Sequence, residues 1–144
     1  MYRKIVVPLD GSPAAECVLA HVGNLAGKGS EVILVRVVAT PALDYTLTEP
    51  QLAACLDDEF TQEASQYLAR VAGTVKKAGV TVSTCVLAER GPIAELLHEF
   101  AHKVNADLIA ISAHGKTGLV GRLLGSTAER IAHHGKLPVL LVHP

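Results

Sequence analysis

A glycine-rich segment at positions 107–128, DLIAISAHGKTGLVGRLLGSTA, contains the residues best suited to chemistry. It begins with an apolar run, Leu108–Ile111, that is typical of a strand buried on both faces. Glycines 115, 118, 121 and 125 follow, and Ser126 with Glu129 three residues later predicts a capping box in which Ser126 is the N-cap of a helix. A strand, a glycine loop and a helix N-terminus favour phosphate binding, because free backbone amides and the helix dipole both attract an anion.

A second candidate loop, Pro8-Leu9-Asp10-Gly11, follows the first apolar run of the chain. In parallel α/β sheets, ligands bind at the carboxyl ends of the strands, where the winding direction reverses. If the first and fourth strands are neighbours, this loop and the glycine loop line one crevice. Asp10 then accepts hydrogen bonds from ribose hydroxyls or interacts with a magnesium ion. The alternative is an ordinary turn residue before a capped helix.

Gly115-Lys116-Thr117 resembles the end of a P-loop, G-x4-G-K-[ST]. The first glycine of that pattern falls on Ala110, inside the apolar run, and eight residues separate Thr117 from Ser126. A P-loop instead leads directly into its helix. We therefore predict no P-loop, and keep Lys116 as a candidate phosphate contact.

His98-Glu99-Phe100-Ala101-His102 is a literal H-E-x-x-H string, which on a helix places two imidazoles one turn apart. At about 100° per residue, both histidines point away from the apolar face of that helix. A catalytic zinc also needs a third protein ligand and a shaped cleft. We therefore predict two solvated histidines and no metal ligated by the protein, apart from magnesium near Asp10.

The composition excludes several classes of function. Of 144 residues, 49% are hydrophobic and 19% charged, and the net charge is -1, which argues against a nucleic-acid or anionic-membrane partner. Tryptophan is absent and aromatic residues make up 3% of the chain, which disfavours base stacking. Three widely spaced cysteines match no metal or redox motif, and no signal peptide or membrane span is predicted. We expect a cytoplasmic protein.

Apolar and amphipathic segments alternate along the chain. The predicted strands are Lys4–Pro8, Val32–Val38, Val80–Leu87, Leu108–Ile111 and Pro138–Val142. The predicted helices run from Pro13, capped by Ser12, to Gly27 or Gly29; from Gln51 to Ala78; from Pro92 to Val104; and from Ser126 to His134. His21 falls on the apolar face of the first helix, where we expect a histidine packed in the core. Residues 39–50 show no periodicity, which predicts a loop.

This order predicts an α/β fold in a single domain, residues 1–144. The sheet has five parallel strands and helices on both faces, in a doubly wound, Rossmann-like arrangement. The half-polar alternation of Val80–Leu87 favours an edge strand.

Three stretches resemble the universal stress protein family, and the resemblance covers essentially the whole chain. They are KIVVPLDGS near the start, SAHGKTGLVGRLLGSTAERI and LPVLLV near the end. Nucleotide-binding members of the family carry the signature G-x2-G-x9-G-[S/T]. Gly115, nine intervening residues and Gly125-Ser126 match it, whereas Ser112 replaces the first glycine. Serine is small and still offers its backbone amide, but members lacking the signature do not bind ATP.

The resemblance implies an adenine nucleotide alpha hydrolase-like fold with ATP and magnesium as cofactors. It places adenine near Val37, ribose near Asp10 and the phosphates near the glycine loop. The predicted binding residues are Pro8, Leu9, Asp10, Val37, Ile111, Ser112, Gly115, Gly125, Ser126 and Thr127.

We predict a nucleotide-binding stress-response protein that uses ATP as a signal or slow substrate, with no catalytic residues assigned. The alternatives are an ATP-independent interaction protein of the same fold and, less favoured, an ATPase or other phosphoryl-transfer enzyme. A homodimer is also predicted through Val139–Val142, because this apolar final strand carries no charge to protect its edge. The resemblance points to the same dimer, and the alternative is an edge covered by the 39–50 loop or by a helix.

Overall fold

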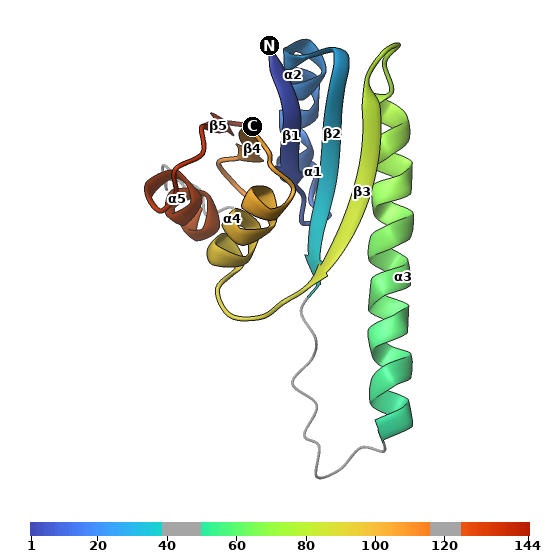
Figure 1. The fold of residues 1–144 in the computed structure, drawn as a ribbon. Helices are drawn as coiled ribbons and strands as arrows, with labels where there is room; N and C mark the ends of the chain where they lie inside the picture. The colour runs from blue at the N-terminus through green and yellow to red at the C-terminus, as the bar shows by residue number, and fades with distance from the viewer. Residues whose placement is uncertain (39–49, 116–124) are drawn as a thin grey trace.

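The computed structural model describes residues 1–38, 50–115 and 125–144, without the side chains of 50–58. Its strands are β1 (Tyr2–Pro8), β2 (Ala26–Val38), β3 (Thr81–Ala88), β4 (Leu108–Ser112) and β5 (Val139–Val142). They form one parallel sheet in the order β3-β2-β1-β4-β5 (Figure 1). The predicted α/β class is therefore confirmed. The half-polar third strand lies at an edge, and the first and fourth strands are neighbours.

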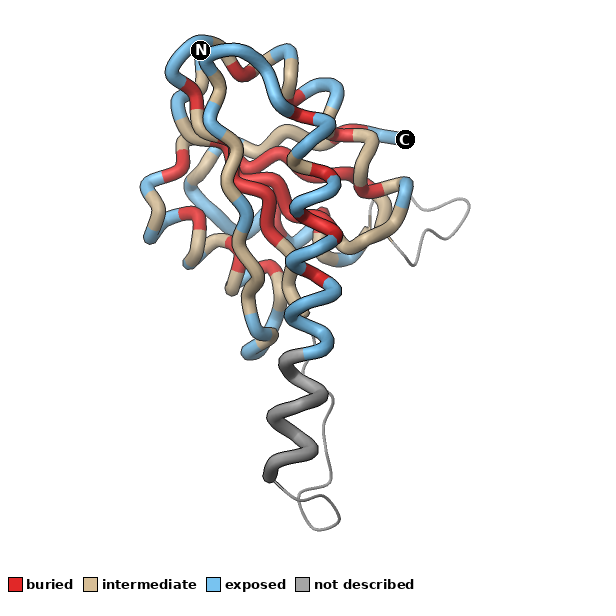
Figure 2. Tube along the Cα trace, turned by 90° about the vertical axis from the view of Figure 1, so that its right-hand side faces the viewer, coloured by how far each residue is buried: buried red, intermediate tan, exposed pale blue. Residues whose placement is uncertain are grey.

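Helices cover both faces of this sheet. They are α1 (Pro13–Glu16), α2 (Val18–Leu25), α3 (Pro50–Val75), α4 (Ile93–Lys103) and α5 (Ser126–His133). One buried core joins α1, α2 and α3 to the sheet, and a second joins α4 and α5 to the opposite face. Figure 2 shows the central strands buried between these layers. Within the described ranges, no helix has the length and apolarity needed to cross a bilayer.

The boundary between the first helix and the second strand differs from the prediction. The helix is interrupted at Cys17, ends at Leu25, and gives way directly to β2 at Ala26. β2 runs through the glycines that were expected to end the helix. Within it, Gly29 adopts a positive φ of 90° and donates its N–H to Gly79 O at 2.7 Å. The pairing of β1 with β2 shifts register here. His21, expected to be packed, is exposed.

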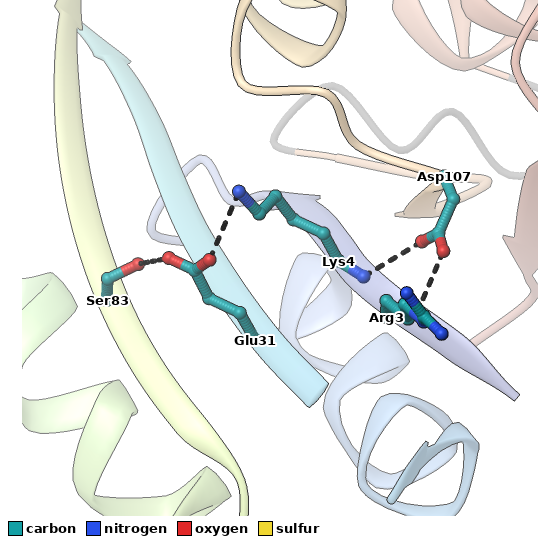
Figure 3. Close-up of polar contacts among 5 residues, drawn as sticks. All are labelled: Arg3, Lys4, Glu31, Ser83 and Asp107. Carbon is teal, nitrogen blue, oxygen red and sulfur yellow. Dashed lines mark hydrogen bonds and ion pairs between the residues drawn. The ribbon is translucent and has the colours of Figure 1, made fainter. Parts of the chain in front are cut away.

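A chain of polar contacts joins the strands near their amino ends (Figure 3). Asp107, just before β4, accepts hydrogen bonds from the backbone N–H of Arg3 at 2.8 Å and of Lys4 at 2.9 Å. The Lys4 ammonium lies 3.3 Å from the Glu31 carboxylate, which also accepts a hydrogen bond from Ser83. Four neighbouring strands are thus tied together by side chains as well as by the backbone ladder.

We expect Asp107→Ala to lower the free energy of unfolding by about 1–2 kcal/mol, because two β1 amides lose their acceptors. Urea denaturation measures the change. Glu99→Ala is the control, since it removes an exposed carboxylate from α4 and should change stability by less than about 0.5 kcal/mol. Equal unfolding midpoints for the two variants would contradict a structural role for Asp107.

Candidate functional site

The winding direction reverses between β1 and β4, and a pocket opens at their carboxyl ends. The helices that follow β1 and β2 lie on one face of the sheet, whereas those that follow β3 and β4 lie on the other. The two loops leaving β1 and β4 therefore diverge and leave a crevice between them. The pocket in this crevice has a volume of about 250 Å³.

All ten residues predicted from the sequence to bind a ligand line this pocket. They are Pro8, Leu9, Asp10, Val37, Ile111, Ser112, Gly115, Gly125, Ser126 and Thr127. The structure thus brings together the loop after β1, Val37 at the end of β2 and the described part of the glycine-rich segment 107–128. The role of these residues in binding remains a prediction. Seven further lining residues were not predicted from the sequence: Ala15, Val35, Ile93, Leu97, Ala113, His114 and Ala128.

The lining is divided into an apolar part and a polar part. Val37, Ile93, Leu97 and Ile111 belong to the core that packs α4 and α5 on the sheet. This apolar part suits a flat ring, which gains from burial against aliphatic side chains. The polar part consists of Asp10, the loop around Gly115 and the start of α5, where hydrogen-bonding groups are concentrated.

The Asp10 side chain is held in a fixed orientation. Its Oδ1 accepts hydrogen bonds from the Ser12 backbone N–H at 2.8 Å and from the Ser12 hydroxyl at 2.5 Å. Ser12 in turn caps α1 by accepting from Ala15 N. On the other side, a Cβ added to Gly115 would lie 2.5 Å from Asp10 Oδ2. A side chain at 115 would therefore force either the Asp10 carboxylate or the glycine loop to shift.

The prediction that Ser126 is the N-cap of α5 is wrong. Gly125, not Ser126, is the N-cap, and no side chain caps the helix. The predicted capping box is absent, because the Glu129 N–H bonds to the Gly125 carbonyl at 2.9 Å and Ser126 already lies inside the first turn. Gly125 N–H donates to Ala113 O at 2.7 Å, which joins the helix start to the end of β4. The first amides of a helix have no partner within it, and here they lie at the pocket wall.

Ser112, which replaces a glycine of the family signature, has its side chain engaged within the protein. The residue is 5% exposed. Its hydroxyl donates to His114 O at 2.7 Å and accepts from His114 N–H at 3.2 Å. The Cys17 thiol approaches the same oxygen at 3.5 Å. The serine hydroxyl therefore stabilises the turn that begins the glycine loop.

His114 is the chemically most versatile residue that sequence reasoning missed. It lies between the two signature positions at 112 and 115 and lines the pocket. Its ring contacts His143 edge to face, with 6.0 Å between the ring centroids. An imidazole can donate a hydrogen bond to a phosphate oxygen. The position of His114 within the glycine loop could therefore have identified it from the sequence as a candidate binding residue.

The H-E-x-x-H string takes part in helix packing. His98 is half-buried, and its Nε2 lies 3.0 Å from Ile131 O on α5. A Cβ at Gly135 would overlap the His98 ring. The expectation that His98 is solvated is therefore wrong, because α5 packs over it, whereas His102 is exposed. The described residues contain no group of three or more potential metal ligands.

Comparison with known proteins shows which family the chain resembles. A model described as "Universal stress protein family" matches residues 1–143. Universal stress protein MJ0531 of Methanocaldococcus jannaschii is 35% identical over 143 residues, which cover 99% of this chain and 82% of that protein. The chain spans 45% of the length of three mycobacterial relatives that it matches at 32% identity.

Solved structures share the fold. The structure of MJ0577 from the same archaeon superposes with a TM-score of 0.87 at 30% identity, covering 100% of this chain and 97% of that one. The universal stress protein of Archaeoglobus fulgidus in complex with dAMP gives a TM-score of 0.68 at 24% identity, with 97% of both chains covered.

Proposed function

Because the chain belongs to the universal stress protein family, we propose that it binds ATP with magnesium in the pocket between β1 and β4. The observation that carries this proposal is the convergence of Asp10, the Gly115 turn and the start of α5 on one pocket with an apolar wall. A related protein of the same fold holds an adenine nucleotide, dAMP. On this proposal the chain is a cytoplasmic stress-response protein.

The pocket offers suitable contacts for each part of a nucleotide. Adenine packs against the aliphatic residues around Val37 and Ile111, and the Asp10 carboxylate accepts from ribose hydroxyls. The phosphates lie against the amides of Gly115, Ser126 and Thr127, where the α5 dipole favours negative charge. Magnesium, bound to the phosphates, gains further from the charge of Asp10.

Calorimetric titration with ATP, with and without magnesium, tests the proposal. We expect saturable binding of one ATP per chain. Nucleotide released by denaturing freshly purified protein, and identified by chromatography, is a second measurement. If wild type binds no adenine nucleotide at millimolar concentration, the alternative is favoured, namely an interaction protein whose glycine loop is structural.

We expect ATP turnover well below the enzyme median of about 10 per second. Asp10 is the only carboxylate among the described lining residues, and its Oδ1 already accepts two hydrogen bonds from Ser12. It is therefore poorly suited to activate a water molecule. Phosphate release under saturating ATP measures the rate. Turnover near the median, lost on His114→Ala, would instead indicate an ATPase with His114 as the base.

We also propose a homodimer that pairs β5 with its copy across a two-fold axis. β5 pairs with β4 along one edge and ends the sheet on that side. Val139, Leu140 and Leu141 are only partly buried within one chain. An apolar edge without charges is suited to pairing with another strand.

A further inference from the structure

A second cleft lies on the face of the sheet covered by α1, α2 and α3. It has a volume of about 490 Å³ and is lined by Gly11, Arg36, Glu63, Gln66, Tyr67 and Arg70. Four of these residues share one face of α3, because they are three or four positions apart. Gly11 follows Asp10 directly, so the same turn contributes to this cleft and to the nucleotide pocket.

Tyr67 is the fixed centre of the cleft. The residue is 7% exposed, and its hydroxyl donates to Glu16 Oε1 at 2.8 Å. Burial, and then the hydrogen bond to Glu16, raise the pKa of Tyr67 well above its ordinary value, so the hydroxyl stays protonated and keeps donating. The Arg36 guanidinium carbon lies 5.0 Å from the Tyr67 ring centroid, and that of Arg70 lies 5.4 Å from it. Two cations are therefore held on one neutral ring.

The two guanidinium groups keep their hydrogen-bond donors available. A cation–π contact uses the charge of a guanidinium, whereas its five N–H groups point outward in its plane. The ion pairs found in the described part of the chain, Lys4–Glu31 and Arg130–Glu95, involve neither arginine. Arg36 also lies over Gly11, where a Cβ would come within 3.1 Å of its Nη1. The arginines are thus ordered in advance for an anion that accepts several hydrogen bonds.

We propose that this cleft binds a small organic phosphate, with its dianion between Arg36 and Arg70 and its hydroxyl groups against Glu63 and Gln66. Two guanidinium charges match one phosphate dianion. The Glu63 carboxylate repels a bare anion but accepts hydrogen bonds from hydroxyl groups, as does the Gln66 amide oxygen. A hydroxylated phosphate is therefore favoured over inorganic phosphate, and the cleft volume leaves room for it.

Titration of ¹⁵N-labelled protein with glycerol 3-phosphate, followed by NMR, tests the site. We expect saturable shifts of the Gly11, Arg36, Tyr67 and Arg70 amides, and weaker binding of inorganic phosphate. Arg70→Gln should weaken glycerol 3-phosphate binding at least about tenfold, and its exposed position in α3 leaves the fold intact. Arg3→Gln is the matched control, because it removes the same charge from an exposed residue at the amino end of β1.

Two further variants make the result decisive. Glu63→Gln should reduce the difference in affinity between glycerol 3-phosphate and inorganic phosphate, because this variant lacks the carboxylate that repels a bare anion. Gly125→Val, which alters the nucleotide pocket at the start of α5 and does not disturb the Asp10–Gly11 turn, should leave glycerol 3-phosphate binding unchanged. The proposal is overturned if Arg70→Gln binds as tightly as Arg3→Gln, if wild type shows no shifts, or if Gly125→Val abolishes them. The last outcome would place the ligand in the nucleotide pocket, and none of these outcomes depends on whether ATP binds.

Discussion

Gly115→Ala is expected to weaken ATP binding by at least about thirtyfold, equivalent to ~2 kcal/mol. The added Cβ would lie 2.5 Å from Asp10 Oδ2, far inside van der Waals contact. Either the Asp10 carboxylate or the glycine loop must move. The first change displaces the carboxylate proposed to bind ribose, and the second displaces the amides proposed to bind phosphate.

A matched glycine separates this local effect from a general one. Gly73 lies in α3, and a Cβ there meets nothing within 4 Å. Gly73→Ala should leave ATP affinity unchanged and stabilise the protein by about 0.5–1 kcal/mol, because alanine favours the helix. Calorimetry gives the affinities, and urea denaturation shows whether both variants are folded.

Gly125→Val extends the comparison to the phosphate end of the pocket. Its Cβ would lie 3.2 Å from Ala113 O, which demands a smaller adjustment than at Gly115. The valine methyl groups would stand beside the first amides of α5, so we expect a loss of ATP affinity with the fold retained. If Gly115→Ala and Gly125→Val both bind ATP like wild type, the nucleotide does not occupy this pocket.

The strands and the pocket could be predicted because their signals are local. Ile5, Val6 and Val7 are fully buried, and such apolar runs bounded by turn residues are typical of central parallel strands. Asp10 and Gly115 follow two such runs, and parallel strands place their carboxyl ends at one edge of the sheet. The order of elements alone therefore brought these two residues together.

The failed predictions concern choices that depend on distant parts of the chain. Gly125 displaces Ser126 as N-cap because its N–H bonds to Ala113 O, at the end of β4. His98 is packed because Ile131, 33 residues later, presents a carbonyl to it. The cleft around Tyr67 combines residues from β2, α3 and the turn after β1. No periodicity within one segment contains this information.

Leu140→Lys is expected to convert a dimer into a monomer in light scattering at tens of micromolar protein. In the proposed dimer, β5 of each chain pairs with its copy and the sheet continues across the two-fold axis. A lysine within this strand places like charges close to the axis in a desolvated interface, and edge lysines are a common means of preventing such pairing. The loss of apolar area at Leu140 weakens the interface further.

The opposite edge of the sheet provides the control. Thr84 is exposed on β3, which ends the sheet on the other side. Thr84→Lys adds the same charge to an edge strand that is not part of the proposed interface, so it should remain dimeric. Circular dichroism is needed for Leu140→Lys, because Leu140 also packs against the core beneath α1 and α2. A wild type that is monomeric at these concentrations refutes the dimer. If folded Leu140→Lys remains a dimer but Thr84→Lys dissociates, the dimer interface lies at β3 and not at β5.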